Sequence, residues 1–521
     1  MLSFSVVINT YNRAPSLRQT LEGLSALDYP LFEIVVVNGP SDDGTDAVLS
    51  DYTGRIKIVR LAERNLSISR NLGIAAAAGD IVAFIDDDAY PDPAWLDRLA
   101  EGYDRAEIAG VGGPTYDYTG HTLQAHHTVT NRLGESWIKG PESPNPTDLL
   151  CRPFSTLYPS LLGTNSSFRR AILRDIGGFD EEFDYYLDET DLCIRLIDAG
   201  YVVRALKDGY IYHKFLPSHL RTATRTLRDR YSVIKNRVYF GLTHGAAHMS
   251  FYEICADLMR FVERHTNEYR WEVDHGRLTQ DDFWKFEADI RRAFAVGYER
   301  AQAKAKLTRP AAWFDAHQTP FLRFPHHDAA AKLHIAFLAP GYPAAPAARA
   351  THWRAVGLVA RGHHVHVLTG GSGQHQVDRE DGVWVHRIVP SPHRRPDTPA
   401  IPARLWNGAA SLHDEVLRIH RHRALDVLEA PLRDFLGIAA LIDGTVPVVI
   451  DPGEPASADG LASLERFCLG RCRATLPPAA QFRDGDDEAP ALDAAETFYR
   501  QLAASGETAP AVDRAAMAVG A

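Results

Sequence analysis

Residues 1–90 alternate between short apolar runs and longer stretches that carry apolar residues at helical spacing. The apolar runs are rich in β-branched residues and predict buried strands at Phe4–Ile8, Glu33–Val37, Ile56–Leu61 and Ile81–Ile85. The stretches between them predict helices from Pro15 through Leu24, over residues 46–51, and from Ser67 to Ala78. Strands and helices that alternate over short links predict an α/β domain with a parallel sheet covered on both faces.

Polar segments follow the carboxyl ends of these predicted strands. Asn9–Arg13 follows the first strand, Asn38–Thr45 the second and Asp86–Asp88 the fourth. In open parallel sheets, ligands bind beyond the carboxyl ends of the strands. We therefore expect the functional site of the N-terminal half at this edge of the sheet.

Asp86, Asp87 and Asp88 directly follow an apolar strand, and three crowded carboxylates repel one another. A hard divalent cation such as Mg²⁺ or Mn²⁺ would relieve this repulsion and would bridge well to a diphosphate. An isolated run of three aspartates is more often a solvated acidic turn. The position of this run among other polar strand ends favours the metal interpretation.

A second acidic cluster, Asp188, Glu189 and Asp191, opens a predicted helix. One of these carboxylates could take the proton of an acceptor hydroxyl, which is the role of a general base. The alternative is structural, because acidic residues at a helix N-terminus suit the helix dipole. His213 ends a short strand and is a candidate ligand of a metal or a diphosphate, although a lone histidine is usually structural.

The composition is that of a globular chain of several domains, with 521 residues, 45% hydrophobic and 24% charged. The net charge of −11 and the lack of a long basic run argue against nucleic acid as a partner. Five scattered cysteines fit reduced thiols better than a disulfide framework. No apolar run approaches the ~20 residues of a membrane span. We therefore expect a cytoplasmic protein, with a peripheral position at the inner face of the membrane as an alternative; the sequence leaves the oligomeric state open.

Residues 1–245 resemble a family 2 glycosyltransferase with the GT-A fold, and the similar motifs occur in order along the whole segment. The matching segments are Val6–Arg13, Asn38–Thr45, Ser69–Gly73, Asp86–Asp88, Gly163–Arg169, Gly177–Glu181 and Asp188–Leu192. The resemblance implies a Rossmann-like nucleotide-sugar domain. It also implies an inverting, metal-dependent transfer of a sugar, with Mn²⁺ or Mg²⁺ as the cofactor.

The same resemblance implies roles for single residues. The implied donor-binding residues are Thr10, Tyr11, Arg13, Asn38, Arg70 and Asp86. The implied metal ligands are Asp86, Asp88 and His213. Glu189 stands where the family has its base, and Asp188 or Asp191 could carry that role instead.

Two positions depart from the family pattern. Asn38 stands where the family often has an aspartate that reads the base, so the choice among UDP, GDP and dTDP sugars stays open. The acidic motif reads Asp188-Glu189 rather than the commoner Glu-Asp order. Both changes keep a competent chemical group.

The second half of the chain predicts three further regions. Residues 246–325 carry apolar residues at helical spacing among dense charge and predict a helical extension that packs on the catalytic domain. Residues 331–476 resemble the N-terminal, Rossmann-like half of a family 4 glycosyltransferase of the GT-B fold. The second lobe, which mainly holds the nucleotide sugar in that fold, has no counterpart here, so an incomplete Rossmann-like domain for docking or acceptor binding is expected. Residues 477–521 predict a loosely ordered tail with a short helix near Ala494–Ala504.

Three histidines of the second half, His363, His364 and His366, suggest a metal cluster at first sight. Alternation along the predicted strand sends His364 and His366 to one face and His363 to the other. We therefore expect surface and packing roles for them.

These motifs predict a glycosyltransferase (EC 2.4 class) that acts on a polysaccharide, a lipid-linked glycan or a glycoprotein, as in the synthesis of cell-envelope polysaccharide. A nucleotidyltransferase would also use acids and a metal, but it would show a glycine-rich phosphate loop near the first strand, and Asn9–Arg13 is not one. A non-catalytic scaffold would bind nucleotide without turnover, and the loss of Glu189 would change nothing.

Overall fold

The computed structural model describes residues 1–143, 147–218, 221–304, 306–325, 332–397, 401–453, 462–481 and 488–505. The chain divides into two compact units, Met1–His326 and His327–Ala521. In the described residues, no helix combines the length and the apolar character needed to cross a membrane.

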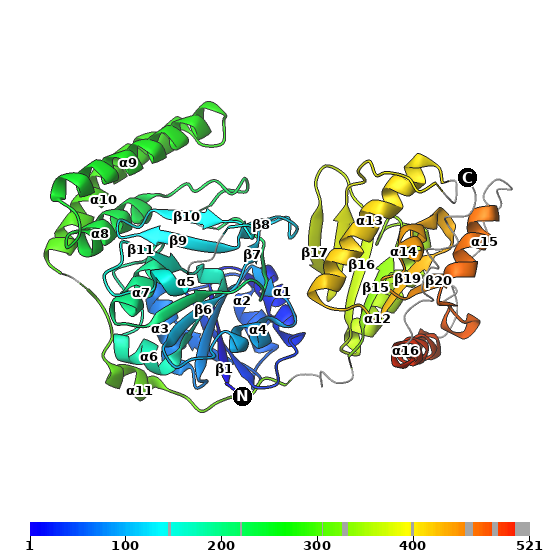
Figure 1. Ribbon diagram of the computed structural model, residues 1–521. Helices are drawn as coiled ribbons and strands as arrows, with labels where there is room; N and C mark the ends of the chain where they lie inside the picture. The colour runs from blue at the N-terminus through cyan, green and yellow to red at the C-terminus, as the bar shows by residue number, and fades with distance from the viewer. Residues whose placement is uncertain are drawn as a thin grey trace. The chain divides into compact units, whose positions relative to one another are not determined.

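A seven-stranded sheet forms the centre of the first unit (Figure 1). Its strands, in spatial order, are β13 (Val202–Ala205), β6 (Ile108–Gly112), β12 (Ser166–Arg169), β4 (Ile81–Asp86), β1 (Phe4–Thr10), β2 (Phe32–Asn38) and β3 (Lys57–Arg60). Strand β12 runs antiparallel to β4 and β6, whereas the other neighbours pair in parallel. The predicted α/β class with a mainly parallel sheet is confirmed.

Helices cover both faces of this sheet because each carries one apolar stripe. The helices α1 (Ala14–Ser25), α2 (Thr45–Ser50) and α4 (Trp95–Glu101) pack into one core, with Leu17, Val48 and Trp95 among its members. The helices α3 (Leu66–Ala76), α6 (Arg170–Ile176) and α7 (Asp188–Asp198) pack into the core on the other face.

Two small sheets stand beside the main one. One contains β5 (Ala89–Pro91), β14 (Ile211–His213), β7 (Thr115–Tyr116) and β8 (Leu123–Ala125). The other contains β10 (Ser136–Lys139), β9 (His127–Asn131) and β11 (Leu157–Ser160), and the short helix α5 (Thr147–Leu150) precedes β11. A 3₁₀ turn at Gly163–Asn165 leads into β12.

The helical segment of this unit begins earlier than residue 246, because α8 spans Tyr231–Gly245. It continues through α9 (Phe251–Asp274), α10 (Gln280–Gln302) and α11 (Ala311–His317). Capping boxes at Ser250 and Thr279 begin the two long helices, which extend from the unit as a pair in Figure 1. After α11 the chain returns to the sheet, where the rings of Phe324 and Phe32 lie 5.5 Å apart.

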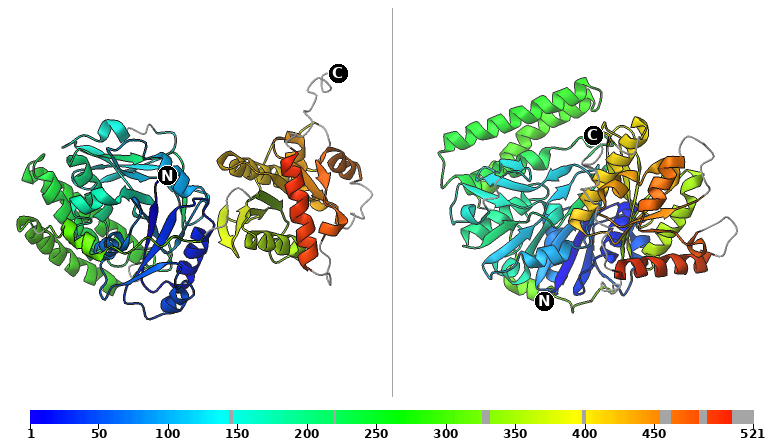
Figure 2. Two further views of the ribbon diagram at one scale, coloured as in Figure 1. Left: turned by 90° about the horizontal axis from the view of Figure 1, so that it is seen from below. Right: turned by 45° about the vertical axis from the view of Figure 1, so that its right-hand side comes forward.

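A second seven-stranded sheet forms the centre of the other unit (Figure 2). Its strands, in spatial order, are β17 (Gln376–Glu380), β18 (Val383–Ile388), β16 (His364–Gly370), β15 (His334–Leu338), β19 (Val427–Pro431), β20 (Val448–Asp451) and β21 (Ala474–Thr475). The helices α13 (Ala403–His422), α14 (Ile438–Asp443) and α15 (Ala462–Arg471) cover one face. The helices α12 (Arg349–Ala360) and α16 (Glu488–Ala504) cover the other.

Two expectations for this unit need correction. The short helix expected near Ala494–Ala504 is present as α16, but it begins earlier, at Glu488, and its Leu492, Ala495 and Tyr499 pack into the core. His363 and His364 are buried rather than on the surface. His363 accepts a hydrogen bond from the backbone of Leu333, which is a packing role.

Candidate active site

A cavity of about 510 Å³ opens at the carboxyl edge of the first unit's sheet. The sequence-predicted residues that line it are Thr10, Tyr11, Arg13, Arg70, Asp86, Asp88, Asp188, Glu189 and His213. The polar strand ends therefore meet around one space, as the parallel arrangement of the strands requires.

Asp86, Asp88 and His213 form one acidic corner of this cavity. Asp86 ends β4, Asp88 follows it, and His213 ends the neighbouring β14. The Nε2 atom of His213 lies 3.5 Å from Asp86 Oδ2 and 3.3 Å from Asp88 Oδ1. One ligand atom from each residue can be chosen so that all three lie within 4.8 Å of one another. Among the described residues, this is the group found with a spacing that could hold a metal ion.

The titration of this corner reflects burial opposed by close charges. Burial would raise the pKa of Asp88, but the hydrogen bond with His213 outweighs it and lowers that pKa. Burial would likewise lower the pKa of His213, but Asp88 and Asp86 raise it. Burial and the nearby Asp88 raise the pKa of Asp87 to about 7.

Arg13 lies beside the same corner. Its guanidinium nitrogens lie 4.0 Å from Asp87 and 3.9 Å from Asp88, and one of them donates to the backbone carbonyl of Leu216. The backbone N–H of Leu216 in turn donates to Asp88. The residues after β14 are thereby tied to the acidic corner.

Across the cavity, Arg70 of α3 pairs with the first two residues of α7. Its Nη1 atom contacts Asp188 and lies 3.4 Å from Glu189 Oε2. Gly163 leaves room for this guanidinium, since a Cβ there would lie 2.3 Å from Arg70 Nη2. Arg70 is buried and already paired with carboxylates, so it is not placed as a free phosphate ligand.

Asp188 and Glu189 differ in the exposed fraction of their side chains and in the direction in which their pKa values are shifted. The Asp188 side chain is 1% exposed and that of Glu189 is 21% exposed. Burial raises the pKa of Asp188 well above its usual range. Burial would raise the pKa of Glu189 as well, but hydrogen bonding to Asp188 and the charge of Arg70 outweigh it and lower that pKa. Glu189 is therefore the more exposed carboxylate of the pair, and it opens on the cavity.

Two residues expected at the site are committed to internal contacts. The Asn38 amide donates to Asp46 and accepts from Ser41, both at 2.8 Å, and Asn38 does not line the cavity. Asp191 also does not line the cavity. Its two carboxylate oxygens contact Arg195 at 2.7 Å and His244 at 2.8 Å.

Several lining residues carry no motif and escaped the sequence analysis. They are Arg64, whose guanidinium lies 4.4 Å from the ring centre of Tyr11, and Arg221, Tyr185, Tyr186 and Ile138. Tyr185 and Tyr186 directly precede the acidic cluster, and that position is the one signal that could have found them. Arg221 and Ile138 lie in segments without any such signal.

Comparison with known proteins identifies the first unit. Residues 5–177 match the model of the family described as Glycosyl transferase family 2. A glucosyl-dolichyl phosphate glucuronosyltransferase of Haloferax volcanii is 28% identical over 228 residues, which are 41% of this chain and 69% of that protein. A chondroitin synthase of Escherichia coli is 27% identical over 242 residues, which are 41% of this chain and 35% of that protein.

The crystal structure of S. aureus TarS 1-349 aligns with 58% of this chain and 92% of that chain, at 18% identity and a TM-score of 0.35. This TM-score is too low to support any conclusion about the fold. The family match covers the part of the cavity lining that includes Asp86 and Asp88, whereas Glu189 and His213 follow the matched segment. The chain therefore carries a glycosyltransferase domain of family 2 in its N-terminal unit.

Proposed function

We propose that the N-terminal unit transfers a sugar, with inversion, from a nucleoside-diphosphate sugar to an acceptor hydroxyl, and that the transfer depends on Mn²⁺ or Mg²⁺. One observation carries the proposal. The acidic corner of Asp86, Asp88 and His213 and the accessible carboxylate of Glu189 line the same cavity. A transferase of this kind needs both a place for the diphosphate and a base for the acceptor.

The corner fits a hard divalent cation by its chemistry. Two carboxylates and one imidazole supply oxygen and nitrogen donors, which suit Mn²⁺ and are compatible with Mg²⁺. The Asp86 side chain is 40% exposed and lines the cavity, so a cation could reach it. When bound, such a cation would neutralise charge on the departing nucleoside diphosphate.

Glu189 would accept the proton of the acceptor hydroxyl, because its carboxylate is 21% exposed and opens on the cavity. Asp188 is buried and would stay protonated, so it is less suited to this role. Arg70 would hold the two carboxylates in place instead of contacting the phosphates. Thr10, Tyr11 and Arg13 would border the nucleotide. Attack on the side of the anomeric carbon opposite to the diphosphate would invert its configuration.

The relatives suggest the class of acceptor. Their names refer to a glucosyl-dolichyl phosphate, to O-antigen biosynthesis in Myxococcus xanthus and to chondroitin. They favour a polysaccharide or a lipid-linked glycan, with a glycoprotein as the further option. Residues 331–476, with their resemblance to half of a family 4 glycosyltransferase, would then bind the acceptor or dock a partner.

The test is the release of nucleoside diphosphate from UDP-, GDP- and dTDP-sugars with Mn²⁺ or Mg²⁺, with and without candidate acceptors. We expect metal-dependent release from one donor class. The Asp88→Ala variant should lower the rate at least about 10³-fold, because charge stabilisation by a metal contributes several kcal/mol. The matched control is Asp451→Ala, which removes an aspartate from a strand end of the other unit and should leave the rate within about twofold. A rate that survives Asp88→Ala or chelation of the metal would refute the proposal.

A further inference from the structure

Helix α7 begins with Asp188 and Glu189 and is entered through a strained turn. Tyr186 and Leu187 both have left-handed backbones, with φ of 73° and 67°. A residue with a Cβ is disfavoured in this conformation and keeps it only where its surroundings hold it there. The contacts that hold this turn therefore bear on where the Glu189 carboxylate points.

The backbone carbonyls from Glu181 to Leu187 all accept hydrogen bonds. Glu181 accepts from Asn65 Nδ2, Glu182 from Lys235 Nζ, Phe183 from Ser67 Oγ and Asp184 from the N–H of Leu66. Tyr185 and Tyr186 both accept from Asn236 Nδ2, and Leu187 accepts from the N–H of Asp191. Buried carbonyls without a partner are costly, so this pairing fixes the path of the segment. Helix α3 and its N-cap Asn65 supply three of the donors, α8 supplies Lys235 and Asn236, and the N–H of Asp191 belongs to α7 itself.

Asn236 of α8 makes the contacts nearest to the left-handed residues. Its Nδ2 atom donates to the carbonyl of Tyr185 at 2.5 Å and to that of Tyr186 at 3.1 Å. The Asn236 side chain is fully buried, and it also lies 3.3 Å from Asp184 Oδ1. Its neighbour Lys235 donates to the carbonyl of Glu182 at 2.8 Å. Both residues follow the segment that matches the family model.

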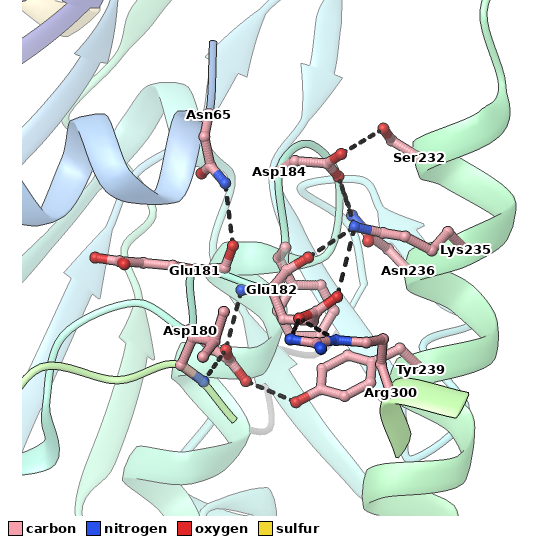
Figure 3. Close-up of polar contacts among 12 residues, drawn as sticks. Asn65, Asp180, Glu181, Glu182, Asp184, Ser232, Lys235, Asn236, Tyr239 and Arg300 are labelled. Carbon is pink, nitrogen blue, oxygen red and sulfur yellow. Dashed lines mark hydrogen bonds and ion pairs between the residues drawn. The ribbon is translucent and has the colours of Figure 1, made fainter. Parts of the chain in front are cut away.

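Figure 3 shows that the same loop is tied to α8 and α10 at its beginning. Asp180 accepts from Tyr239 at 2.9 Å, Glu182 accepts from Arg300 at 2.8 Å, and Asp184 accepts from Ser232 at 2.9 Å. These contacts anchor the start of the loop, whereas those of Asn236 reach the turn itself.

We infer that Asn236 is a positioning residue that holds the Tyr185–Leu187 turn and thereby aims the Glu189 carboxylate into the cavity. The inference rests on the proposed function, in which Glu189 is the base. An asparagine suits the task because its amide group offers N–H donors to two carbonyls. An aspartate of the same shape would offer none and would repel both carbonyls and Asp184.

The test compares Asn236→Leu, which keeps a similar volume without donors, with Asp257→Asn as a matched control. Asp257 pairs with Arg237, the next residue of α8, at 2.8 Å. The control therefore disturbs the same helix without touching the turn. The readouts are hydrogen exchange of residues 183–191, nucleotide affinity, and kcat and KM for transfer.

For Asn236→Leu we expect exchange in residues 183–191 to quicken at least about tenfold. We expect kcat to fall about 10²-fold, because a misplacement of about 1 Å can cost that much, while nucleotide affinity stays within about twofold. The control should lower thermal stability and leave kcat of the folded protein within about twofold. Unchanged exchange in residues 183–191, or an equal loss of kcat in both variants, would overturn the inference. Should the wild type transfer no sugar, the proposed function fails, and the exchange result still decides whether Asn236 holds the turn.

Discussion

Both units of this chain gather an arginine and two carboxylates near the carboxyl ends of their parallel strands. In the first unit Arg70 pairs with Asp188 and Glu189. In the second unit Arg354 pairs with Glu429 and Asp451. The two clusters have the same composition and a similar place on a seven-stranded sheet.

The clusters differ in what surrounds them. In the second unit, Tyr499 of α16 donates a hydrogen bond to Glu429, and Arg354 is fully buried. Asp451 keeps 22% of its side chain exposed, yet the described residues place no carboxylate–histidine group of metal-binding spacing beside it. In the first unit, by contrast, Glu189 faces a cavity whose other wall holds Asp86, Asp88 and His213. A buried cluster of an arginine and carboxylates therefore indicates a structural role by itself. It indicates a catalytic role only where one carboxylate opens on a cavity that other polar residues line.

The largest expected effect comes from removing one carboxylate of each cluster. Glu189→Gln should lower the rate of transfer about 10²–10⁴-fold, the usual loss for a general base, while nucleotide affinity is kept. Glu429→Gln should leave the rate within about twofold, because that carboxylate contacts only its own cluster in the described structure. The measurement is kcat for transfer together with nucleotide affinity by calorimetry.

Two outcomes would break the comparison. A Glu189→Gln variant with the wild-type rate would remove the base from its proposed place. A loss of rate in Glu429→Gln as large as that in Glu189→Gln would show that the second unit takes part in the chemistry.

The next effect concerns stability and uses the two arginines. Arg354→Met should lower the free energy of unfolding of the second unit by about 3–5 kcal/mol, because it leaves a buried carboxylate without its partner. Transfer by the folded protein should stay within about twofold. Arg70→Met should destabilise the first unit in the same way and also reduce kcat about 10²-fold, since Glu189 loses the group that holds it.

Hydrogen exchange of strand segments in each unit would assign these losses to their units. A loss of transfer in Arg354→Met that equals the loss in Arg70→Met would contradict the prediction. A normal rate in Arg70→Met would show that Glu189 keeps its position without the arginine.

The sequence predicted the part of the fold that follows from apolar periodicity. The strands at Phe4–Ile8 and Ile81–Ile85 appear as β1 and β4, with ends that differ by one or two residues. Because parallel strands bring their carboxyl ends to one edge, Asp86 and the Asn9–Arg13 segment could also be expected near each other.

The direction of single side chains could not be predicted in the same way. Asn38 turns to Asp46, and Asp191 turns to His244, which is 53 residues further along the chain. Such pairings depend on tertiary packing and leave no periodic signal. Composition predicted a loose tail up to the short helix near Ala494, whereas α16 begins at Glu488 and its Leu492 already packs into the core.

The smallest expected effect is an opposite response of the two units to mild acid. In the first unit, carboxyls with raised pKa values outnumber histidines with lowered pKa values among the described residues. The carboxyls are Asp86, Asp87, Asp180 and Asp188, and the histidines are His126, His248 and His265. A carboxyl such as Asp87, with a pKa of about 7, holds a proton in the folded state that the unfolded chain releases above pH ~4. Its contribution to stability therefore grows as the pH falls from 7.

The second unit should respond in the other direction, because burial lowers the pKa values of His363, His366 and His413. Below pH ~6.5 these imidazoles are protonated in the unfolded chain but stay neutral in the folded protein. The free energy of unfolding of the second unit therefore falls as the pH falls. The raised pKa of Glu429 offsets one of them. Each uncompensated group contributes at most about 1.4 kcal/mol per pH unit. The measurement is hydrogen exchange at pH 7 and pH 5.5, corrected for the intrinsic exchange rate. A chelator keeps the acidic corner free of metal. At the lower pH we expect the first unit to gain protection from exchange relative to the second unit. An equal change of protection in both units would contradict the prediction. The two units would then differ in the access of their carboxylates to a cavity, but not in how their titratable groups change stability with pH.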